Sequence, residues 1–254
     1  MPQSIDIILE ELDQVLAEAR RQRSRVGYFA ALYRDVTARV KAAIEAGDFE
    51  NGARMERLDV RFARRYLDAL EAHESGSDPP RAWARTFAVA GRWRPLVLHH
   101  LLLGMNAHIN LDLGIAAAEI TTEETLPDLK ADFDRINQIL GSMIETVQAR
   151  VADVSPWIGV LDRLGGRADE VISNFCLVQA RKDAWGLATN LAVLDAEAQA
   201  RAITAKDGET ARRTADILRP GGPWVVPALL WVRLWEENDV PAVLSVLSRT
   251  SPAV

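Results

Sequence analysis

The stretch from Pro95 to about Ile120 constrains the fold of this chain more than any other part of the sequence. Leucine, isoleucine and alanine dominate it, and Asp112 is its one acidic residue before Glu119. A helix that is apolar on almost every side is stable only when other elements surround it. Three histidines, two asparagines and the aspartate also lie within it, and a lipid-facing span would tolerate them poorly. The stretch therefore predicts a central buried helix and no transmembrane segment.

The rest of the chain shows the same helical periodicity. Apolar residues recur every three or four positions, as on one face of an amphipathic helix, and no segment sustains the alternation of a strand. Breaks that contain glycine or proline separate these patterns. Ser4 and Gly47 stand where an N-cap and a C-terminal stop are expected. Besides the central helix, helices are predicted at residues 5–23, 27–46, 51–73, 81–90, 121–154, 157–164, 170–205, 209–218, 225–237 and 240–248.

These patterns predict an all-α fold, a multi-helix bundle around the central buried helix at about residues 95–120. Nothing in the sequence has the composition of a linker, so residues 1–254 are expected to form a single helical domain. Hydrophobic residues make up 48% of the chain and charged residues 26%. This is the balance of a globular protein that buries a sizeable core under a solvated exterior.

Charge and cysteine content narrow the partners and the location. A net charge of -6 argues against binding to nucleic acid or to an anionic membrane, which select basic surfaces. The single cysteine, Cys176, permits no internal disulfide, and its apolar neighbours predict a buried thiol. The N-terminus lacks a basic region followed by an apolar stretch, so no secretory signal is expected. We therefore expect a cytoplasmic protein with a small-molecule ligand and no nucleic acid partner, and a homo-oligomer stays open.

Six polar residues of the central helix form the candidate functional site. At about 100° per residue, three of them fall within about 40° on one face, and an i, i+4 pair lies on a second face. The sixth, His100, lies two turns before His108, with Gly104 between them. Each buried polar group that lacks a partner costs about 1–3 kcal/mol, so neighbouring helices must supply partners. The first face carries His99, Asn106 and Asn110, and the second carries His108 and Asp112.

Two other predicted helices carry further candidates. Asp59 and Tyr66 lie close to one line on the helix at 51–73, and Asp59 could reach the central helix. A solvated face with local ion pairs is the alternative, because charged runs on helices are usually exterior. Arg181 and Trp185 share a face at i, i+4 and could form an anion-binding or aromatic wall, or else a stacked structural pair.

Three tryptophans near the C-terminus have the spacing of one helical side: Trp224, Trp231 and Trp235. Large aromatic residues with this spacing are most often core residues. An exposed surface for a partner is the alternative. The sequence thus predicts that these three side chains are buried.

Together the polar residues indicate an enzyme that acts on a small, largely apolar molecule held among the helices. A histidine oriented by a carboxylate serves as a general base or as a metal ligand. Hydrolysis and a cofactor-free rearrangement or cyclisation fit equally. The alternative is a non-catalytic ligand-binding or assembly protein in which the polar network fixes helix register. The catalytic candidates are His100, His108, Asp112 and Asp59, and the substrate-binding candidates are His99, Asn106, Asn110, Arg181, Trp185 and Tyr66.

Cofactor and metal content stay open. The sequence has no glycine-rich phosphate loop, no Gly-x-Ser-x-Gly elbow, no Cys-x-x-Cys and no His-Glu-x-x-His. The stretch from His108 to Asp112 resembles the His-x-x-x-Asp segment of zinc-dependent helical phospholipases and nucleases, which implies a metal-dependent hydrolase as a further alternative. Those enzymes need surrounding histidines, whereas this chain has four in total.

Three segments together resemble a family of uncharacterised bacterial helical proteins classed as a domain of unknown function. The most specific is Gly-Met-Asn-Ala-His-Ile-Asn-x-Asp at residues 104–112, and the others are residues 61–70 and 180–185. The resemblance covers most of the chain. It implies that these positions matter to the family, and it brings no established activity with it.

Overall fold

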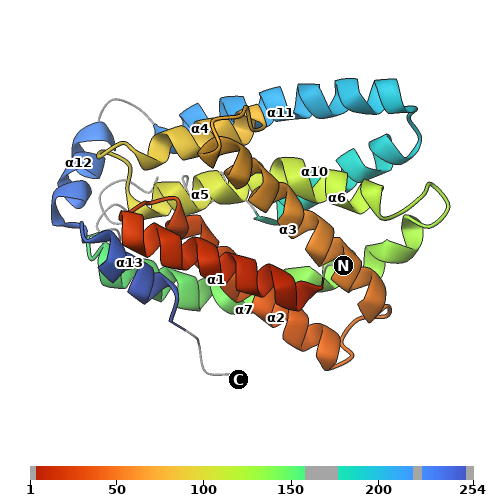
Figure 1. Ribbon diagram of the computed structural model, residues 1–254, viewed down its shortest axis with the longest axis horizontal. Helices are drawn as coiled ribbons and strands as arrows, with labels where there is room; N and C mark the ends of the chain where they lie inside the picture. Colours follow the sequence, from red (N-terminus) through yellow and green to blue (C-terminus); the bar gives the residue numbers. More distant parts are fainter. Residues whose placement is uncertain (1–3, 158–176, 220–224, 250–254) are drawn as a thin grey trace.

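The computed structural model describes residues 4–157, 177–219 and 225–249. Helices account for most of these ranges, which contain no strand, so the predicted all-α fold is confirmed. Figure 1 shows the helices packed against one another as a bundle, with α3 crossing in front of α5 and α6. The helices are α1 (Ile5–Gln22), α2 (Gly27–Glu45), α3 (Gly52–Glu74), α4 (Arg81–Ala90), α5 (Val97–Ala107), η1 (His108–Asp112), α6 (Leu113–Glu119), η2 (Pro127–Leu129), α7 (Lys130–Val154), α10 (Leu177–Ala192), α11 (Ala196–Leu218), α12 (Val225–Trp235) and α13 (Val240–Leu247).

The central helix is formed by α5, η1 and α6, which follow one another without a break from Val97 to Glu119. Its middle turn, η1, is π-helical. By length and composition this helix could cross a membrane, but 83% of its most apolar window is buried inside the fold. The helices α2, α3, α4, α10 and α11 pack around it. It is therefore the buried core helix that the sequence predicts.

Two glycines let neighbouring helices approach the central helix closely. A Cβ atom at Gly104 would lie 2.3 Å from the ring of Phe29 on α2, and one at Gly114 would lie 2.5 Å from the backbone oxygen of Ala184 on α10. Real Cβ atoms do not approach other atoms so closely, so any side chain at either position would force the helices apart. Gly104 thus serves packing, and the ring of Phe29 fills the space beside it.

Helix ends agree with the sequence where a capping residue marks them. The Ser4 hydroxyl accepts a hydrogen bond from the Ile7 amide at the start of α1. Asn51 caps α3 by accepting from the Arg54 amide at 2.9 Å. Gly47, with a φ of 76°, follows the end of α2 in the left-handed region that favours glycine. Local chemistry is enough to place these boundaries.

Three predicted helix boundaries are wrong. Residues 121–129 form turns and the short helix η2, and α7 starts at Lys130, because Pro127 and turn bonds around Thr122 interrupt the pattern. The helix predicted at 170–205 is divided at residues 193–195, where Asp195 caps the start of α11. Conversely, Gly208 does not end a helix but lies inside α11. The helix predicted at 157–164 lies almost entirely outside the described residues, as do residues 170–176.

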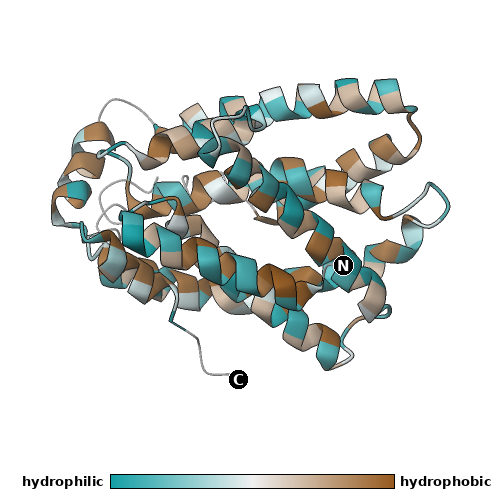
Figure 2. Cartoon of the chain, in the orientation of Figure 1, coloured by the Kyte–Doolittle hydropathy of each residue, from teal (hydrophilic) through white to brown (hydrophobic). Residues whose placement is uncertain are grey.

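The tryptophans near the C-terminus correct another prediction. Trp231 and Trp235 on α12 are 51% and 56% exposed and contact each other, so they are not core residues. Trp224 lies outside the described residues. Figure 2 shows hydrophobic residues on α12 and α13 at one end of the bundle, while the longer outer helices alternate between hydrophilic and hydrophobic positions. The spacing of the tryptophans indicated a shared helical side but not which way that side faces.

Candidate functional site

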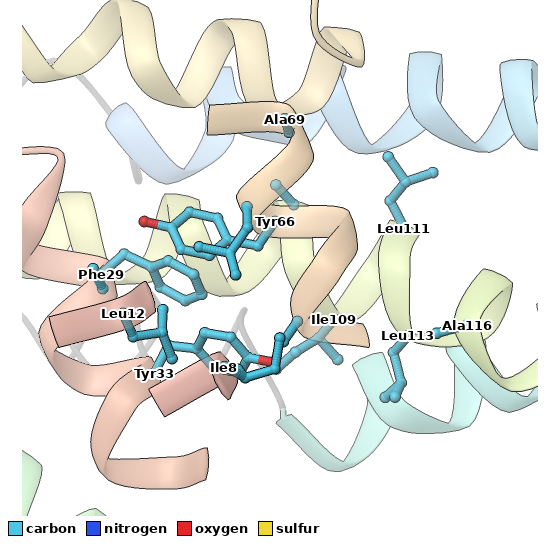
Figure 3. Close-up of a cluster of buried hydrophobic side chains, with 14 of the residues drawn as sticks. Ile8, Leu12, Phe29, Tyr33, Tyr66, Ala69, Ile109, Leu111, Leu113 and Ala116 are labelled. Atoms are coloured by element: carbon cyan, nitrogen blue, oxygen red, sulfur yellow. The ribbon is translucent and has the colours of Figure 1, made fainter. Parts of the chain in front are cut away.

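A cavity of about 850 Å³ lies against the central helix. Its walls come from α2, α3, α5, η1, α6, α7 and α10, with one residue of α12. Figure 3 shows Phe29, Tyr33 and Ile109, which all line this cavity, converging between α2, α3 and the central helix. This volume is near the upper end of the range for ligand pockets, and such pockets are typically apolar with a few polar groups. The polar side chains of the wall are Tyr33, Asp59, His99, His108, Asn137, Gln148 and Arg181.

His108 and Asp112 form a buried pair on the π-helical turn. Nδ1 of His108 lies 3.2 Å from Oδ2 of Asp112, and both side chains are almost completely buried. The same carboxylate accepts hydrogen bonds from Nε1 of Trp83 at 2.8 Å and from Nε of Arg65 at 3.3 Å. Because the carboxylate accepts from these donors, it also accepts from His108, which places the imidazole proton on Nδ1. Asp112 therefore fixes both the orientation and the tautomer of His108.

The environment of His108 keeps the imidazole neutral. The ring stacks on Phe62 with ring centres 3.5 Å apart, and Tyr33 meets it edge-on at 4.4 Å. Burial among these rings lowers the pKa of His108, and the bond to Asp112 opposes this shift only in part. Nε2 has no hydrogen-bond partner. With Nδ1 protonated, Nε2 carries a lone pair, which is the arrangement of a general base.

Asp59 is a second titratable group in the cavity wall. It is buried on α3, its Oδ2 atom has no hydrogen-bond partner, and burial raises its pKa to about 7, with a further contribution from the charge of Glu56. Burial and the nearby Asp59 carboxylate together raise the pKa of Tyr33 well above its usual value. The Tyr33 and Thr37 hydroxyls are neighbours, but neither has a hydrogen bond of normal geometry. Near pH 7 Asp59 can thus either accept or donate a proton.

Arg181 lies in the wall formed by α10. Its guanidinium donates to the backbone oxygen of Phe133 on α7 and lies over the Phe133 ring, 4.4 Å from the ring centre. Nε has no hydrogen-bond partner. Asn137, one turn further along α7, also lines the cavity, and its Oδ1 atom is buried without a partner. Together these side chains leave one unpartnered donor and one unpartnered acceptor, both buried, in a mostly apolar wall.

The other two histidines of the central helix differ in location. His99 lines the cavity, and its Nδ1 accepts from the Leu96 amide at 3.0 Å; burial lowers its pKa to about 4. His100 does not line this cavity but packs edge-on against Tyr28, beside a much smaller void. Its Nε2 atom has no partner, and burial lowers its pKa to about 3. The cavity therefore brings together His99 and His108, and His100 lies apart from it.

Asn106 and Asn110 face α11 and do not line the cavity. Asn106 donates to the backbone oxygen of Thr210 at 3.0 Å and accepts from Asn110 at 3.2 Å. Asn110 in turn accepts from Arg213 at 3.1 Å. All these contacts are made by the protein itself and join α11 to the central helix.

Tyr66 and Trp185 are also not part of the cavity wall. Tyr66 is fully buried, meets Phe29 edge-on with ring centres 5.2 Å apart, and lines the smaller void beside His100. Trp185 packs on Phe133 at 5.0 Å and lies under the ammonium group of Lys130. Of the residues proposed from sequence, the cavity thus gathers Asp59, His99, His108 and Arg181, with Asp112 behind His108.

Three functional neighbours were not expected from the sequence. Trp83 and Arg65 bind Asp112 from α4 and α3, and Tyr33 contacts His108 from α2. Arg65 stands in an arginine-rich run that has the composition of a solvated face. The one available signal is that Trp83 is an indole donor on a short helix, and such donors need an acceptor when buried.

The described residues do not fit a multi-ligand metal centre. Within the described ranges, no group of three or more histidine, cysteine, aspartate or glutamate side chains lies close enough to hold a metal ion. His108 and Asp112 bind each other and other protein groups, rather than pointing two free ligands at one position. Zinc sites in proteins need three or four such ligands.

Comparison with known proteins extends the description. A family model described as a family of unknown function (DUF5995) matches residues 5–220, which is most of the chain. The matched range includes the whole central helix and every described side chain of the cavity wall except Leu229. The comparisons with curated proteins and with solved structures each gave no match. The chain belongs to the family of unknown function DUF5995.

Proposed function

We propose that this protein is an enzyme that acts on a small, largely apolar molecule bound in the cavity, with His108 as the general base. One combination of observations carries the proposal: His108 lines a large cavity, its buried Nε2 atom has no hydrogen-bond partner, and Asp112 holds Nδ1. An unsatisfied buried nitrogen costs about 1–3 kcal/mol, so a function that needs it is the simplest explanation. A ligand or a bound water supplies the missing donor.

Proton transfer to Nε2 would create an imidazolium ion, and Asp112 stabilises that charge through Nδ1. Trp83 and Arg65 keep the Asp112 carboxylate in place. Asp59, protonated for part of the time near pH 7, can donate the proton that a leaving group or rearranged product requires. Two groups with opposite proton preferences in one wall are the usual components of acid/base catalysis.

The reaction classes that fit are hydrolysis and a cofactor-free rearrangement or cyclisation. Within the described part of the chain, no serine, threonine or cysteine is hydrogen-bonded to Nε2, so a covalent nucleophile of the serine hydrolase type is not supported. In our proposal His108 removes a proton either from water or directly from the substrate. A metal-dependent hydrolase receives no support from the donor set.

The composition of the wall favours a second candidate, a non-catalytic ligand-binding protein. Most of the wall is aliphatic or aromatic, which suits the retention of an apolar guest without turnover. In that case His108 would accept a hydrogen bond from the guest and would transfer no proton. The two candidates differ in whether His108 affects a rate or only an affinity.

A substitution at His108 tests the proposal. His108→Asn keeps a donor toward Asp112 and removes the base, and His100→Asn is the matched control at a buried histidine outside the cavity. We expect wild-type protein to hydrolyse p-nitrophenyl octanoate if the enzyme is hydrolytic, with kcat lower by on the order of 10²–10⁴-fold in His108→Asn and unchanged in His100→Asn. Equal rates in all three folded proteins would refute the role of His108, and no turnover by wild type would remove hydrolysis and leave rearrangement or binding.

A further inference from the structure

Arg181 differs from the other arginines that the structure buries. Arg150 pairs with Asp35 at 3.0 Å, and Arg233 pairs with Glu236 at 3.4 Å. Arg181 is 4% exposed, yet no carboxylate among the described residues lies within ion-pair distance of it. Its protein contacts are the neutral backbone oxygen and the ring of Phe133. Among the described residues this buried cation therefore has no counter-ion within ion-pair distance, although it lines an apolar cavity.

Such an arrangement is energetically unfavourable unless another group compensates the charge. Burial of a charge costs several kcal/mol unless an opposite charge or several hydrogen bonds compensate it. Burial lowers the pKa of Arg181 to about 10, and the more distant charge of Asp134 opposes this only partly. The Nε–H of Arg181 also has no hydrogen-bond partner. The cost is recovered if an anionic group of a ligand binds there.

The charge balance of the wall indicates which anion fits. The described wall holds one arginine and no lysine, and Asp59 contributes a negative charge once it ionises. A single guanidinium matches the charge and planar fork of a carboxylate. A phosphate dianion or a diphosphate would leave negative charge uncompensated in the apolar surroundings.

We propose that the cavity binds an amphipathic carboxylic acid, with its carboxylate on Arg181 and its hydrocarbon body along the apolar wall toward His108. This rests on the proposed function only in that both place the ligand in the same cavity. The hydrocarbon part follows from the aliphatic and aromatic side chains of α2, α5 and α7 that form most of the wall. Arg181 is thereby a binding residue that selects the substrate class, and His108 acts on a more remote part of the molecule.

Three probes of equal chain length test the head group. Binding of dodecanoate, dodecan-1-ol and dodecylamine to the full-length protein is measured by calorimetry at pH 8 below the micelle concentrations. We expect dodecanoate to bind at least tenfold more tightly than the alcohol, and the amine more weakly than the alcohol. The proposal is overturned if the acid does not bind, if acid and alcohol bind equally, or if the amine binds most tightly.

Substitutions of Arg181 test whether this residue causes the preference for the acid. Arg181→Met is expected to make the acid and the alcohol bind within about threefold of each other, while Arg181→Lys keeps part of the preference because it keeps the charge. Arg201→Met removes an exposed charge on α11 and is expected to change nothing. If Arg181→Met does not fold, the Lys variant and the three probes on wild type still decide. A preference for the acid that persists in folded Arg181→Met would overturn the assignment.

The same measurements separate this inference from the catalytic proposal. His108→Asn is expected to retain the tenfold preference for dodecanoate, because it does not change Arg181. Loss of ester turnover in His108→Asn, with no preference for the acid in wild type, would support His108 as the general base. It would refute Arg181 as the carboxylate-binding residue. A preference for the acid, with no effect of the His108 substitution on any rate, would support Arg181 as the carboxylate-binding residue. The protein would then be a ligand-binding protein rather than an enzyme.

Discussion

The central helix has two polar sides, and they differ in whether protein groups satisfy them. Toward α11, Asn106 and Asn110 bind each other, the backbone of Thr210 and the side chain of Arg213. Toward the cavity, Nε2 of His108 has no partner. The residue types on the two sides are equally polar, and the sequence gives them similar spacing. Their difference teaches that a polar cluster on a core helix indicates a site only where atoms remain unpaired beside free space.

His108 connects the two situations. Its Nδ1 belongs to a satisfied network, because Asp112 also binds Trp83 and Arg65, while its buried Nε2 has no hydrogen-bond partner. A rigid support on one nitrogen and an unpartnered second nitrogen is the arrangement by which proteins orient a catalytic imidazole. The hydrogen bonds at Nδ1 thus orient the ring whose Nε2 has no partner. We expect substitutions of hydrogen-bonded groups to lower the free energy of unfolding, and substitution of an unpartnered buried group to raise it.

Asp112→Leu is expected to give the largest loss of stability. It leaves the Trp83 and Arg65 donors and His108 without their shared acceptor, and removal of one partner of a buried charged pair costs about 3–5 kcal/mol. Urea unfolding followed by circular dichroism measures this loss, and Asp112→Asn should lose less because it keeps an acceptor. A loss below about 1 kcal/mol for Asp112→Leu would mean that the network does not support the fold.

Asp59→Asn should instead raise the free energy of unfolding relative to wild type at neutral and higher pH. Because burial raises the pKa of Asp59 to about 7, the folded state holds a proton that the unfolded chain releases near pH 4. The stability of wild type therefore falls as the pH rises from about 4 to 7, by at most on the order of 1 kcal/mol per pH unit from this group. The Asn variant should lack that part of the decline.

Glu236 provides the internal control for this pH series. Burial also raises its pKa to about 7, so it contributes a decline of the same sign to both proteins. The difference between wild type and Asp59→Asn isolates Asp59. If the two free energies of unfolding stay parallel from pH 4 to pH 8, Asp59 is not held in a buried, unpaired state.

Asn106→Leu is expected to cost about 1–3 kcal/mol, because it leaves the Asn110 side-chain amide without its acceptor and removes the hydrogen bond to the Thr210 carbonyl. Ligand binding should be retained in the folded variant, since Asn106 does not line the cavity. Thermal unfolding and the dodecanoate titration measure the two effects. Loss of binding in a variant that is as stable as wild type would reverse our assignment of the α11 side as structural.

Substitutions at two glycines that have free space around them are expected to change stability the least. Nothing lies within 4 Å of a Cβ atom at Gly141 on α7, which lines the cavity, or at Gly186 on α10, which does not. Alanine at either position should stabilise the helix by about 0.5–1 kcal/mol. Leucine at Gly141 should also weaken ligand binding, whereas leucine at Gly186 should not. Equal binding by both leucine variants would show that the ligand does not use this wall.

Local sequence signals predict the helices of this fold and several of the helix ends. Apolar periodicity identified the central helix, and capping residues such as Ser4 and Asn51 marked helix ends. The boundaries failed where a local signal was overridden: Gly208 continues α11, and Pro127 delays the start of α7. A glycine inside a helix costs about 1 kcal/mol, which the packing of a long helix readily offsets.

Contacts within the candidate site were predictable only along the central helix, although Asp59 and Arg181 on other helices were also proposed from the sequence and line the cavity. The i, i+4 spacing of His108 and Asp112 predicts their contact, and the structure shows it at 3.2 Å. Trp83 and Arg65 come from other helices, and their contacts depend on tertiary packing that no local pattern encodes. Nor does spacing show that Asn106 faces α11 while His108 faces a cavity. That distinction depends on which neighbours the remaining helices supply.

The state of the His108 ring tests the central claim most directly. In uniformly ¹⁵N-labelled protein with four histidines, long-range ¹⁵N–¹H spectra distinguish the two neutral tautomers from the imidazolium ion. Our account predicts, for the signals that His108→Asn removes, a protonated Nδ1 and an unprotonated Nε2 at pH 7, with Nε2 shifting when dodecanoate is added and the signals of His100 unchanged. A protonated Nε2 at pH 7, or no response to any ligand that binds the cavity, would contradict it.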